Sequence, residues 1–303
     1  MGRYNRLLSG SIDRLTAGVK GRASPDELRE RFRFSKRGPN VQLAGRVEAC
    51  RLLLDRGELD AAGEAADEIL VFRRAHRTVH NVTFNALHMA ATAYEQCGRL
   101  PEAIAVREEL LVLARSRSGT DSPQALNLMG RLATDLLKSG ETAGAVDLQR
   151  QAFDRWRRTT GVESRDTVKA ELGLGIALVA NGDFPEAQKA LEHVVAALGE
   201  LNPEARIARS WLALALTRQG NPEASLRLGE ETLSITERAY GPDDRRTLRA
   251  ADQVAETLWR LGRRERAQAM LEGSLATRER MFGDQDPDTQ KARKRLSTLL
   301  DEG

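Results

Sequence analysis

The sequence is poor in aromatic residues, in cysteine and in long apolar runs. Only 4% of its 303 residues are aromatic and only two are cysteines. Two cysteines argue against a disulfide scaffold, and no apolar run approaches the roughly 20 residues that a membrane-spanning helix needs. The N-terminus also lacks the uninterrupted apolar segment of a signal peptide. We therefore expect a soluble, cytoplasmic protein.

Histidine is scarce as well, which bears on catalysis and metal binding. The four histidines are His76, His80, His88 and His193. We expect His76 and His80 to lie on either side of a helix boundary, and no glutamate completes a zinc-protease motif. A Ser/His/Asp or Cys/His catalytic set cannot be assembled from so few histidines. We therefore expect no catalytic residue, no metal site and no cofactor, and a protein that is not an enzyme.

The most prominent feature that the sequence does contain is an internal repeat. Turn glycines recur at separations of 41, 42, 42, 38 and 42 residues, and a small residue follows each of them four or five positions later. Such a period is the signature of a repeat architecture. The turn glycines are Gly57, Gly98, Gly140, Gly182, Gly220 and Gly262, and the small residues are Ala62, Ala103, Ala145, Ala187, Ala224 and Ala267. A second set, at Gly119, Gly161, Gly241 and Gly283, marks the ends of repeats.

Each repeat is expected to contain two helices. Glycine supplies the left-handed residue that ends the first helix, and Pro101, Pro185 and Pro222 suit the first turn of the second helix. Apolar residues recur at helical spacing, and a helix pair with one apolar face must stack on its neighbours to bury it. The pattern predicts an all-α protein, an α-solenoid of about six helix pairs.

This pattern resembles the tetratricopeptide repeat, in the 42-residue form of kinesin light chains. The resemblance rests on the turn glycine, the packing alanine and linkers such as YGPDDRRTL and FGDQDPDTQ, in which Asp244 or Asp288 is expected near a helix N-cap. The fifth repeat departs from the others, with a turn that reads one residue shorter (QGNPEA). There we predict a local change of superhelical pitch near residues 199–222.

The resemblance suggests three parts of the chain. Residues 1–40 form a basic helical arm with ten basic and four acidic side chains, residues 41–286 form the solenoid, and residues 287–303 form a C-terminal capping helix. An amphipathic stripe in residues 3–20 suits either a capping helix or a surface that binds a partner. Nucleic acid or a membrane is the less favoured partner of this arm, in which no helix-turn-helix is legible.

The family resemblance implies that the first helix of each repeat lines an inner groove. Counting back from each turn glycine predicts a groove that is polar in repeats two and three, apolar in four and five, and charged in six. The candidate partner-binding residues are Asn85, His88, Thr92, Asn127, Arg131, Thr134, Lys138, Lys169, Ile176, Ser210, Trp211, Arg249 and Trp259. Kinesin-light-chain repeats carry an asparagine pair in the first helix that is absent here, so their peptide-clamping chemistry is not carried over.

These observations favour a non-catalytic scaffold or adaptor that binds a protein or peptide in its groove. Arg131, Lys138 and Lys169 would meet acidic groups, and Trp211 and Trp259 would be aromatic anchors. Two alternatives stay open. One is a regulatory sensor for a small molecule or signal peptide, and the other is a subunit that self-associates as a homodimer through the apolar strip.

Overall fold

The computed structural model describes residues 38–301, which form thirteen α-helices and no strand. The all-α prediction is therefore confirmed for this part of the chain. The predictions for the basic arm up to residue 37, and for its amphipathic stripe in residues 3–20, lie outside the described residues. The helices are α3 (Pro39–Asp55), α4 (Leu59–Ala75), α5 (His80–Gln96), α6 (Leu100–Ser118), α7 (Pro123–Ser139), α8 (Thr142–Thr160), α9 (Arg165–Asn181), α10 (Phe184–Ala197), α11 (Pro203–Arg218), α12 (Pro222–Tyr240), α13 (Arg245–Arg260), α14 (Arg264–Phe282) and α15 (Pro287–Asp301).

Twelve of these helices form the six predicted pairs, from α3–α4 to α13–α14, and each pair is joined at one of the predicted turn glycines. All six glycines have positive φ, between +73° and +92°. The N–H group after each glycine bonds to the carbonyl five residues earlier, as from Glu141 to Leu136 at 2.8 Å and from Asp183 to Leu178 at 2.9 Å. This is the Schellman arrangement, which satisfies carbonyls that the helix end leaves without partners.

A different backbone conformation ends the second helices. Gly119, Gly241 and Gly283 follow α6, α12 and α14 with φ of 83° to 91° and ψ of 159° to 164°. This region is open almost only to glycine, which explains why the second glycine set marks the ends of repeats.

The predicted packing alanines are buried in five of the six pairs, as at Ala62 and Ala267, which are both fully buried. The fifth pair corrects the prediction: Ala224 is only half-buried, and Ser225, 1% exposed, occupies the buried position. Ser225 lies five residues after Gly220, as Ala267 does after Gly262. The turn of this repeat is therefore not shortened. The shortening lies before the turn, in α10, which has 14 residues where the other second helices have 17 or 19.

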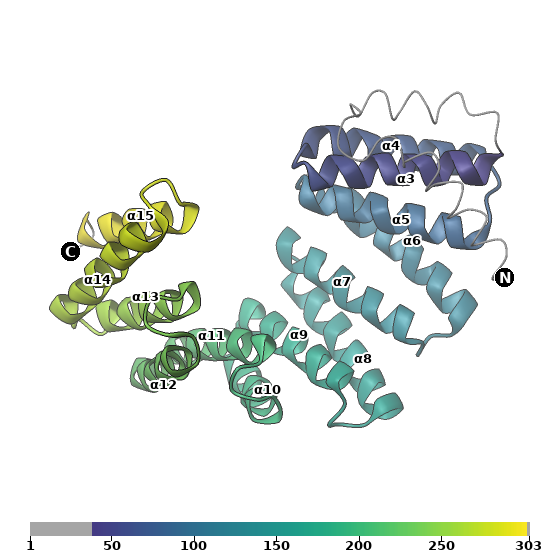
Figure 1. Cartoon of the computed structure of the whole chain (residues 1–303). Coiled ribbons are helices and arrows are strands. Elements are labelled where there is room, and N and C mark those ends of the chain that lie inside the picture. The colour runs from purple at the N-terminus through teal and green to yellow at the C-terminus, as the bar shows by residue number, and fades with distance from the viewer. Residues whose placement is uncertain (1–37, 302–303) are drawn as a thin grey trace. The chain divides into compact units, whose positions relative to one another are not determined.

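The chain divides into two compact units, and the boundary falls between Leu148 and Gln149, inside α8. In the first unit α3 to α7 pack on one another in chain order, and α3 also contacts α5, so the first helices of neighbouring repeats touch (Figure 1). In the second unit α9 to α15 pack in the same way, with α15 against α14.

Close approach of paired helices is clearest between α9 and α10. A Cβ atom at Gly175 would lie 2.7 Å from Cδ2 of Leu191, which is fully buried. Gly175 therefore sets the distance between these two helices. At the C-terminus α15 begins at Pro287, the first residue of the predicted capping segment, and Arg293, Lys294 and Arg295 are exposed.

Candidate functional site

A polar pocket lies in the last repeats of the second unit. Its volume is about 330 Å³, and residues of five helices, α11 to α15, line it. We call it the C-terminal pocket. Its lining consists of Arg206, Ser210, Thr232, Arg246, Arg249, Ala250, Asp252, Gln253, Arg278, Asp288, Lys291, Ala292 and Arg295. Six of these side chains are cationic and two are anionic, so the pocket is basic.

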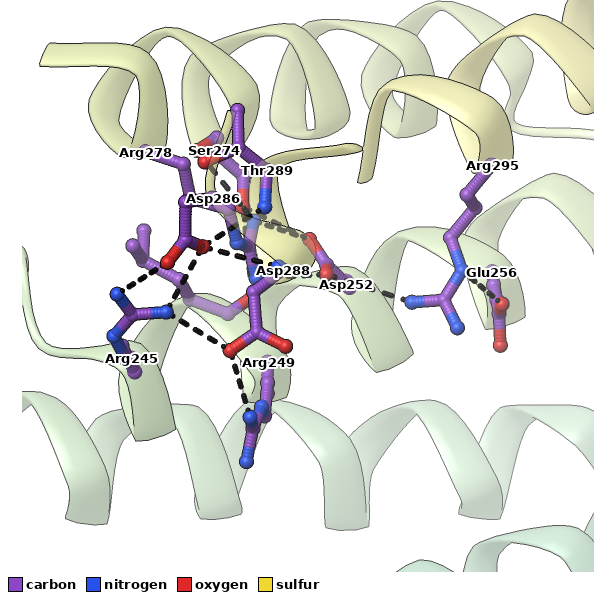
Figure 2. A network of polar contacts seen from close by, with 11 residues as sticks. Arg245, Arg249, Asp252, Glu256, Ser274, Arg278, Asp286, Asp288, Thr289 and Arg295 are labelled. Atoms are coloured by element: carbon purple, nitrogen blue, oxygen red, sulfur yellow. Dashed lines mark hydrogen bonds and ion pairs between the residues drawn. The ribbon is translucent and has the colours of Figure 1, made fainter. Parts of the chain in front are cut away.

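A buried ion pair lies beside this pocket. Asp252 of α13 and Arg278 of α14 are 4% and 2% exposed, and Nη2 of Arg278 lies 2.9 Å from Oδ2 of Asp252 (Figure 2). The Ser274 hydroxyl donates to Oδ1 of Asp252 at 2.8 Å and also accepts from Arg278. A buried charge is tolerated where it is paired and hydrogen-bonded. This network fixes α14 against α13.

The start of α15 is held by two arginines of α13. Arg245 bonds Asp286 at 2.7 Å and Asp288 at 3.1 Å, and Arg249 bonds Asp288 at 2.7 Å (Figure 2). Oδ1 of Asp286 also accepts the N–H groups of Asp288 and Thr289, at 3.0 and 3.2 Å. The Arg245 guanidinium and these N–H groups lower the pKa of Asp286 to about 2.

These contacts settle the N-cap predictions. Asp244 is the N-cap of α13, where its side chain accepts the N–H of Arg246 at 2.8 Å. For α15 the capping side chain is Asp286, whereas the predicted Asp288 lies in the first turn. Asp288 is free to bind Arg249 because Asp286 makes the capping bonds.

A third contact joins α15 to α13 further along the helix. Arg295 lies 2.8 Å from Glu256 and 3.4 Å from Asp252. The charged side chains of a terminal capping helix would ordinarily point into solvent. The Arg295 side chain is 41% exposed and reaches back to both carboxylates. The capping helix is therefore also a wall of the pocket.

A second pocket lies in the first unit, between α5 and α7. Its volume is about 500 Å³, and we call it the N-terminal pocket. Phe84, His88, Gln124, Asn127, Leu128, Gly130, Arg131 and Thr134 line it. Four of the thirteen candidate residues therefore come together here. Burial, and then the Arg131 charge, lower the pKa of His88, which favours the neutral imidazole at pH 7.

In the first unit, four charges of α5, α6 and α7 form a network that runs from the interior to the surface. Arg107, 3% exposed, pairs with Glu95, and its Nε lies 2.7 Å from Oδ2 of the fully buried Asp135 without hydrogen-bond geometry. Lys138 donates to Glu95 at 2.6 Å. Burial raises the pKa of Asp135 to about 6. Lys138, expected to meet a partner's acidic group, is thus already paired.

The other candidates lie outside both pockets or on their rims. In the first unit Asn85 is exposed, and the Thr92 hydroxyl donates to the His88 carbonyl at 2.9 Å. In the second unit Ser210 and Arg249 line the C-terminal pocket. Lys169 is exposed and lies 3.5 Å from Glu204.

The predicted apolar strip and aromatic anchors are partly buried. Leu172 and Val179 are 7% and 6% exposed, and Ile176 is half-buried. Trp211 is half-buried, and Trp259 packs against the buried cluster Leu226, Val254, Leu258 and Ala267. Trp259 therefore supports the core of the last repeats, whatever else it contacts. The binding roles of these residues stay predictions.

Sequence reasoning missed most of the C-terminal pocket. Five of the missed residues lie on the helices that were counted as groove-lining or capping, and one, Arg278, lies on a second helix. The missed charged and amide residues are Arg206, Arg246, Gln253, Arg278, Lys291 and Arg295. The repeat period was the sequence signal that could have found Gln253. This residue lies 43 residues after Ser210, and its amide bonds to the Ser210 hydroxyl at 3.1 Å.

Two kinds of site are absent from residues 38–301. No group of three or more His, Cys, Asp or Glu side chains in this range is arranged to hold a metal ion. Within the same range, no helix is both long and apolar enough to cross a membrane. His76 and His80 lie on either side of a helix boundary as predicted, because α4 ends at Ala75 and α5 begins at His80.

The architecture defined by these helix pairs is that of an α-solenoid protein. A family model of the tetratricopeptide repeat matches residues 82–158, 125–200 and 204–301, which together make up more than half of the chain. The chain belongs to the tetratricopeptide repeat family, as its turn glycines and packing residues predicted.

Three relatives illustrate the extent of this similarity. A clustered mitochondria protein homolog of Aspergillus clavatus is 27% identical over 154 residues, which are 50% of this chain and 12% of the relative. The structure of a putative kinesin light chain of Podosopora anserina with nearly identical TPR-like repeats has a TM-score of 0.62 and 24% identity, over 67% of this chain and 98% of that one. A tetratricopeptide repeat protein of Parabacteroides merdae has a TM-score of 0.62 and 15% identity, over 98% of this chain and 100% of that one. The two solved structures show the shared fold.

Proposed function

We propose that the protein is a non-catalytic adaptor that holds a segment of a partner protein against the first helices of its repeats. The tetratricopeptide fold is in general a protein-interaction scaffold. The observation that carries the proposal is that each unit has a polar pocket lined mainly by first helices. The pockets therefore lie on the helices that the family resemblance assigns to the groove.

The chemistry of the pockets suits an extended peptide. In the N-terminal pocket Gln124, Asn127 and Arg131 offer amide and guanidinium donors, and Phe84 and Leu128 offer apolar surface. Amides can donate to and accept from a peptide backbone, while an arginine favours a carboxylate. A mixed lining of this kind distinguishes peptide sequences through side-chain contacts at fixed positions along rigid helices.

The N-terminal pocket can be tested with a random-peptide display library that carries no phosphorylation. Peptides selected on the wild-type protein would then be titrated against Asn127→Ala/Arg131→Glu by fluorescence anisotropy. Arg74→Glu is the matched control, because Arg74 is an exposed arginine on the second helix α4 of the same unit. We expect the pocket variant to lose at least about tenfold in affinity and the control to keep it.

Circular dichroism must first show that both variants are folded. Enrichment of no peptide, or equal affinity for the pocket variant and the wild type, would refute an adaptor that uses this pocket. Light scattering tests the alternative in which the protein self-associates. If the wild type forms a stable homodimer and Arg131→Glu is monomeric, the partner is a second copy of the chain and not a peptide. A sensor for a small ligand would instead show binding of neither peptide nor copy.

A further inference from the structure

Most charges around the C-terminal pocket are matched one to one. Five arginines that line it or adjoin it each have a carboxylate partner within 3.0 Å. The pairs are Arg245 with Asp286, Arg246 with Asp244, Arg249 with Asp288, Arg278 with Asp252, and Arg295 with Glu256. These ten charges cancel, so they contribute no net charge to the pocket.

Two cationic side chains of the lining are left over. Arg206 of α11 and Lys291 of α15 line the pocket, and neither forms an ion pair with any residue in the part of the chain that the structure describes. They come from opposite sides of α13, because α13 is bonded to α11 through Ser210 and Gln253 and to α15 through Asp252 and Arg295. The pocket thus has a formal excess of two positive charges from two helices.

We propose that the C-terminal pocket binds a phosphate monoester, namely a phosphorylated serine or threonine of the partner segment. This proposal rests on the proposed adaptor function and adds the chemistry that the second unit recognises. A phosphorylated side chain carries about −1.5 to −2 charges at pH 7 and three strong acceptor oxygens. That charge matches the excess from Arg206 and Lys291.

A dianion fits this pocket better than one carboxylate does. A single carboxylate would neutralise only one of the two unmatched cations, and the arginines around them are already held by their own acids. Two neighbouring acidic side chains could neutralise both, but ordering two side chains costs more conformational entropy than ordering one. The Gln253 amide donates one of its two N–H groups to Ser210 at 3.1 Å, and the second N–H suits an additional oxygen of a phosphate.

The walls of the pocket are fixed before any ligand binds. The buried Asp252–Arg278 pair joins α13 to α14, and the bonds from Arg245 and Arg249 to the first turn of α15 hold the helix that carries Lys291. Side chains held on rigid helices lose less entropy on binding than those on mobile loops. The ion pairs therefore fix the position of the helix that carries Lys291.

The test uses small capped probes and isothermal titration calorimetry on the full chain. The probes are N-acetyl-O-phosphoserine methylamide, its unphosphorylated form, a capped Glu-Glu dipeptide and inorganic phosphate. The variants are Arg206→Gln and Lys291→Gln. Their matched controls are Arg218→Gln on α11 and Lys294→Gln on α15, which remove the same charges from exposed positions outside the pocket lining.

We expect the phosphoserine probe to bind the wild type and each pocket variant to weaken it by about tenfold, with the controls within about twofold. Binding should also weaken from low to moderate salt. Equal losses of affinity in the pocket variants and in the controls would show that binding depends only on the overall charge, which would overturn the site. Equal affinity for Glu-Glu would overturn the preference for phosphate, and tighter binding of inorganic phosphate than of phosphoserine would overturn a phosphorylated protein as its source.

The two proposals fail separately. If unphosphorylated peptides bind the N-terminal pocket but phosphoserine does not bind the wild type, only the phosphate site is refuted. If phosphoserine binds through Arg206 and Lys291 but no peptide binds anywhere, the adaptor function is refuted while an anion site remains.

Discussion

Removing one partner of the buried Asp252–Arg278 pair should destabilise the last repeats, and the two single changes should differ in cost. Asp252→Leu leaves Arg278, 2% exposed, with only the hydroxyl and the carbonyl of Ser274 as partners. Arg278→Met leaves Asp252 with the Ser274 hydroxyl at 2.8 Å and with Arg295 at 3.4 Å. The carboxylate thus keeps a cation, whereas the guanidinium keeps none.

The expected magnitudes follow from this asymmetry. We expect Asp252→Leu to lower the free energy of unfolding by about 3–5 kcal/mol, which is the cost of an uncompensated buried charge. For Arg278→Met we expect about 1–3 kcal/mol, because the remaining carboxylate is still hydrogen-bonded. The double variant replaces the pair with apolar side chains and should lie within about 1 kcal/mol of the wild type. The coupling between the two sites should therefore exceed about 2 kcal/mol.

Urea unfolding followed by far-UV circular dichroism gives the four stabilities, and hydrogen exchange locates the effect. Because solenoid repeats contact only their neighbours, exchange in Asp252→Leu should rise in α13, α14 and α15 and stay unchanged in α3 and α4. The reasoning is refuted if Asp252→Leu costs less than Arg278→Met, or if the double variant is as unstable as Asp252→Leu.

Four further substitutions test other parts of the structure. Gly175→Ala should destabilise the protein by about 1–3 kcal/mol in thermal unfolding, since its Cβ would meet Leu191 at 2.7 Å. In contrast, Gly273→Ala, in open space within α14, should stabilise the protein by about 0.5–1 kcal/mol. Asp244→Ala should cost about 1 kcal/mol in urea unfolding through loss of the α13 cap, and no loss would exclude a capping role. The pKa of Asp135, about 6, exceeds its ordinary value, so the folded protein binds this proton more readily and stability falls as pH rises from about 4 to about 6. Relative to Asp135→Asn, the wild type should lose up to about 3 kcal/mol of unfolding free energy across this range, and parallel pH profiles would contradict the assignment.

The fold could be predicted from the sequence because local chemistry determines it. A glycine at positive φ, a proline in a first helical turn and a small residue at the helix contact each act within one repeat. Ser225 was missed because alanine was taken as the packing residue, so the neighbouring Ala224 was chosen in its place. The serine is small enough to fill the same buried position. The register of the turn, rather than the residue type, decides which side chain is buried.

Site residues could be predicted only where the number of residues before the turn glycine determines by itself which face of the helix a side chain occupies. His88, Asn127, Arg131 and Thr134 meet in the N-terminal pocket because they lie on the exposed faces of two adjacent first helices. The C-terminal pocket also uses side chains from second helices and from the capping helix, whose directions depend on ion pairs. Arg295 illustrates this, since it turns back toward Asp252 instead of into solvent.

These ion pairs nevertheless follow the repeat, because neighbouring repeats present equivalent faces. Three contacts between successive first helices, or between α13 and the capping helix, join residues 43 apart: Glu95 with Lys138, Ser210 with Gln253, and Asp252 with Arg295. Contacts between successive second helices join residues 36 apart: Arg73 with Glu109, Arg150 with Glu186, and Glu230 with Arg266. Each separation differs from the 42-residue period by a constant number of residues, because the two residues in contact do not lie at equivalent positions of their repeats. Opposite charges at these two separations therefore help to set the inter-repeat register. Arg206 has no such partner within residues 38–301 and lines the C-terminal pocket, which leaves it available to the proposed phosphate.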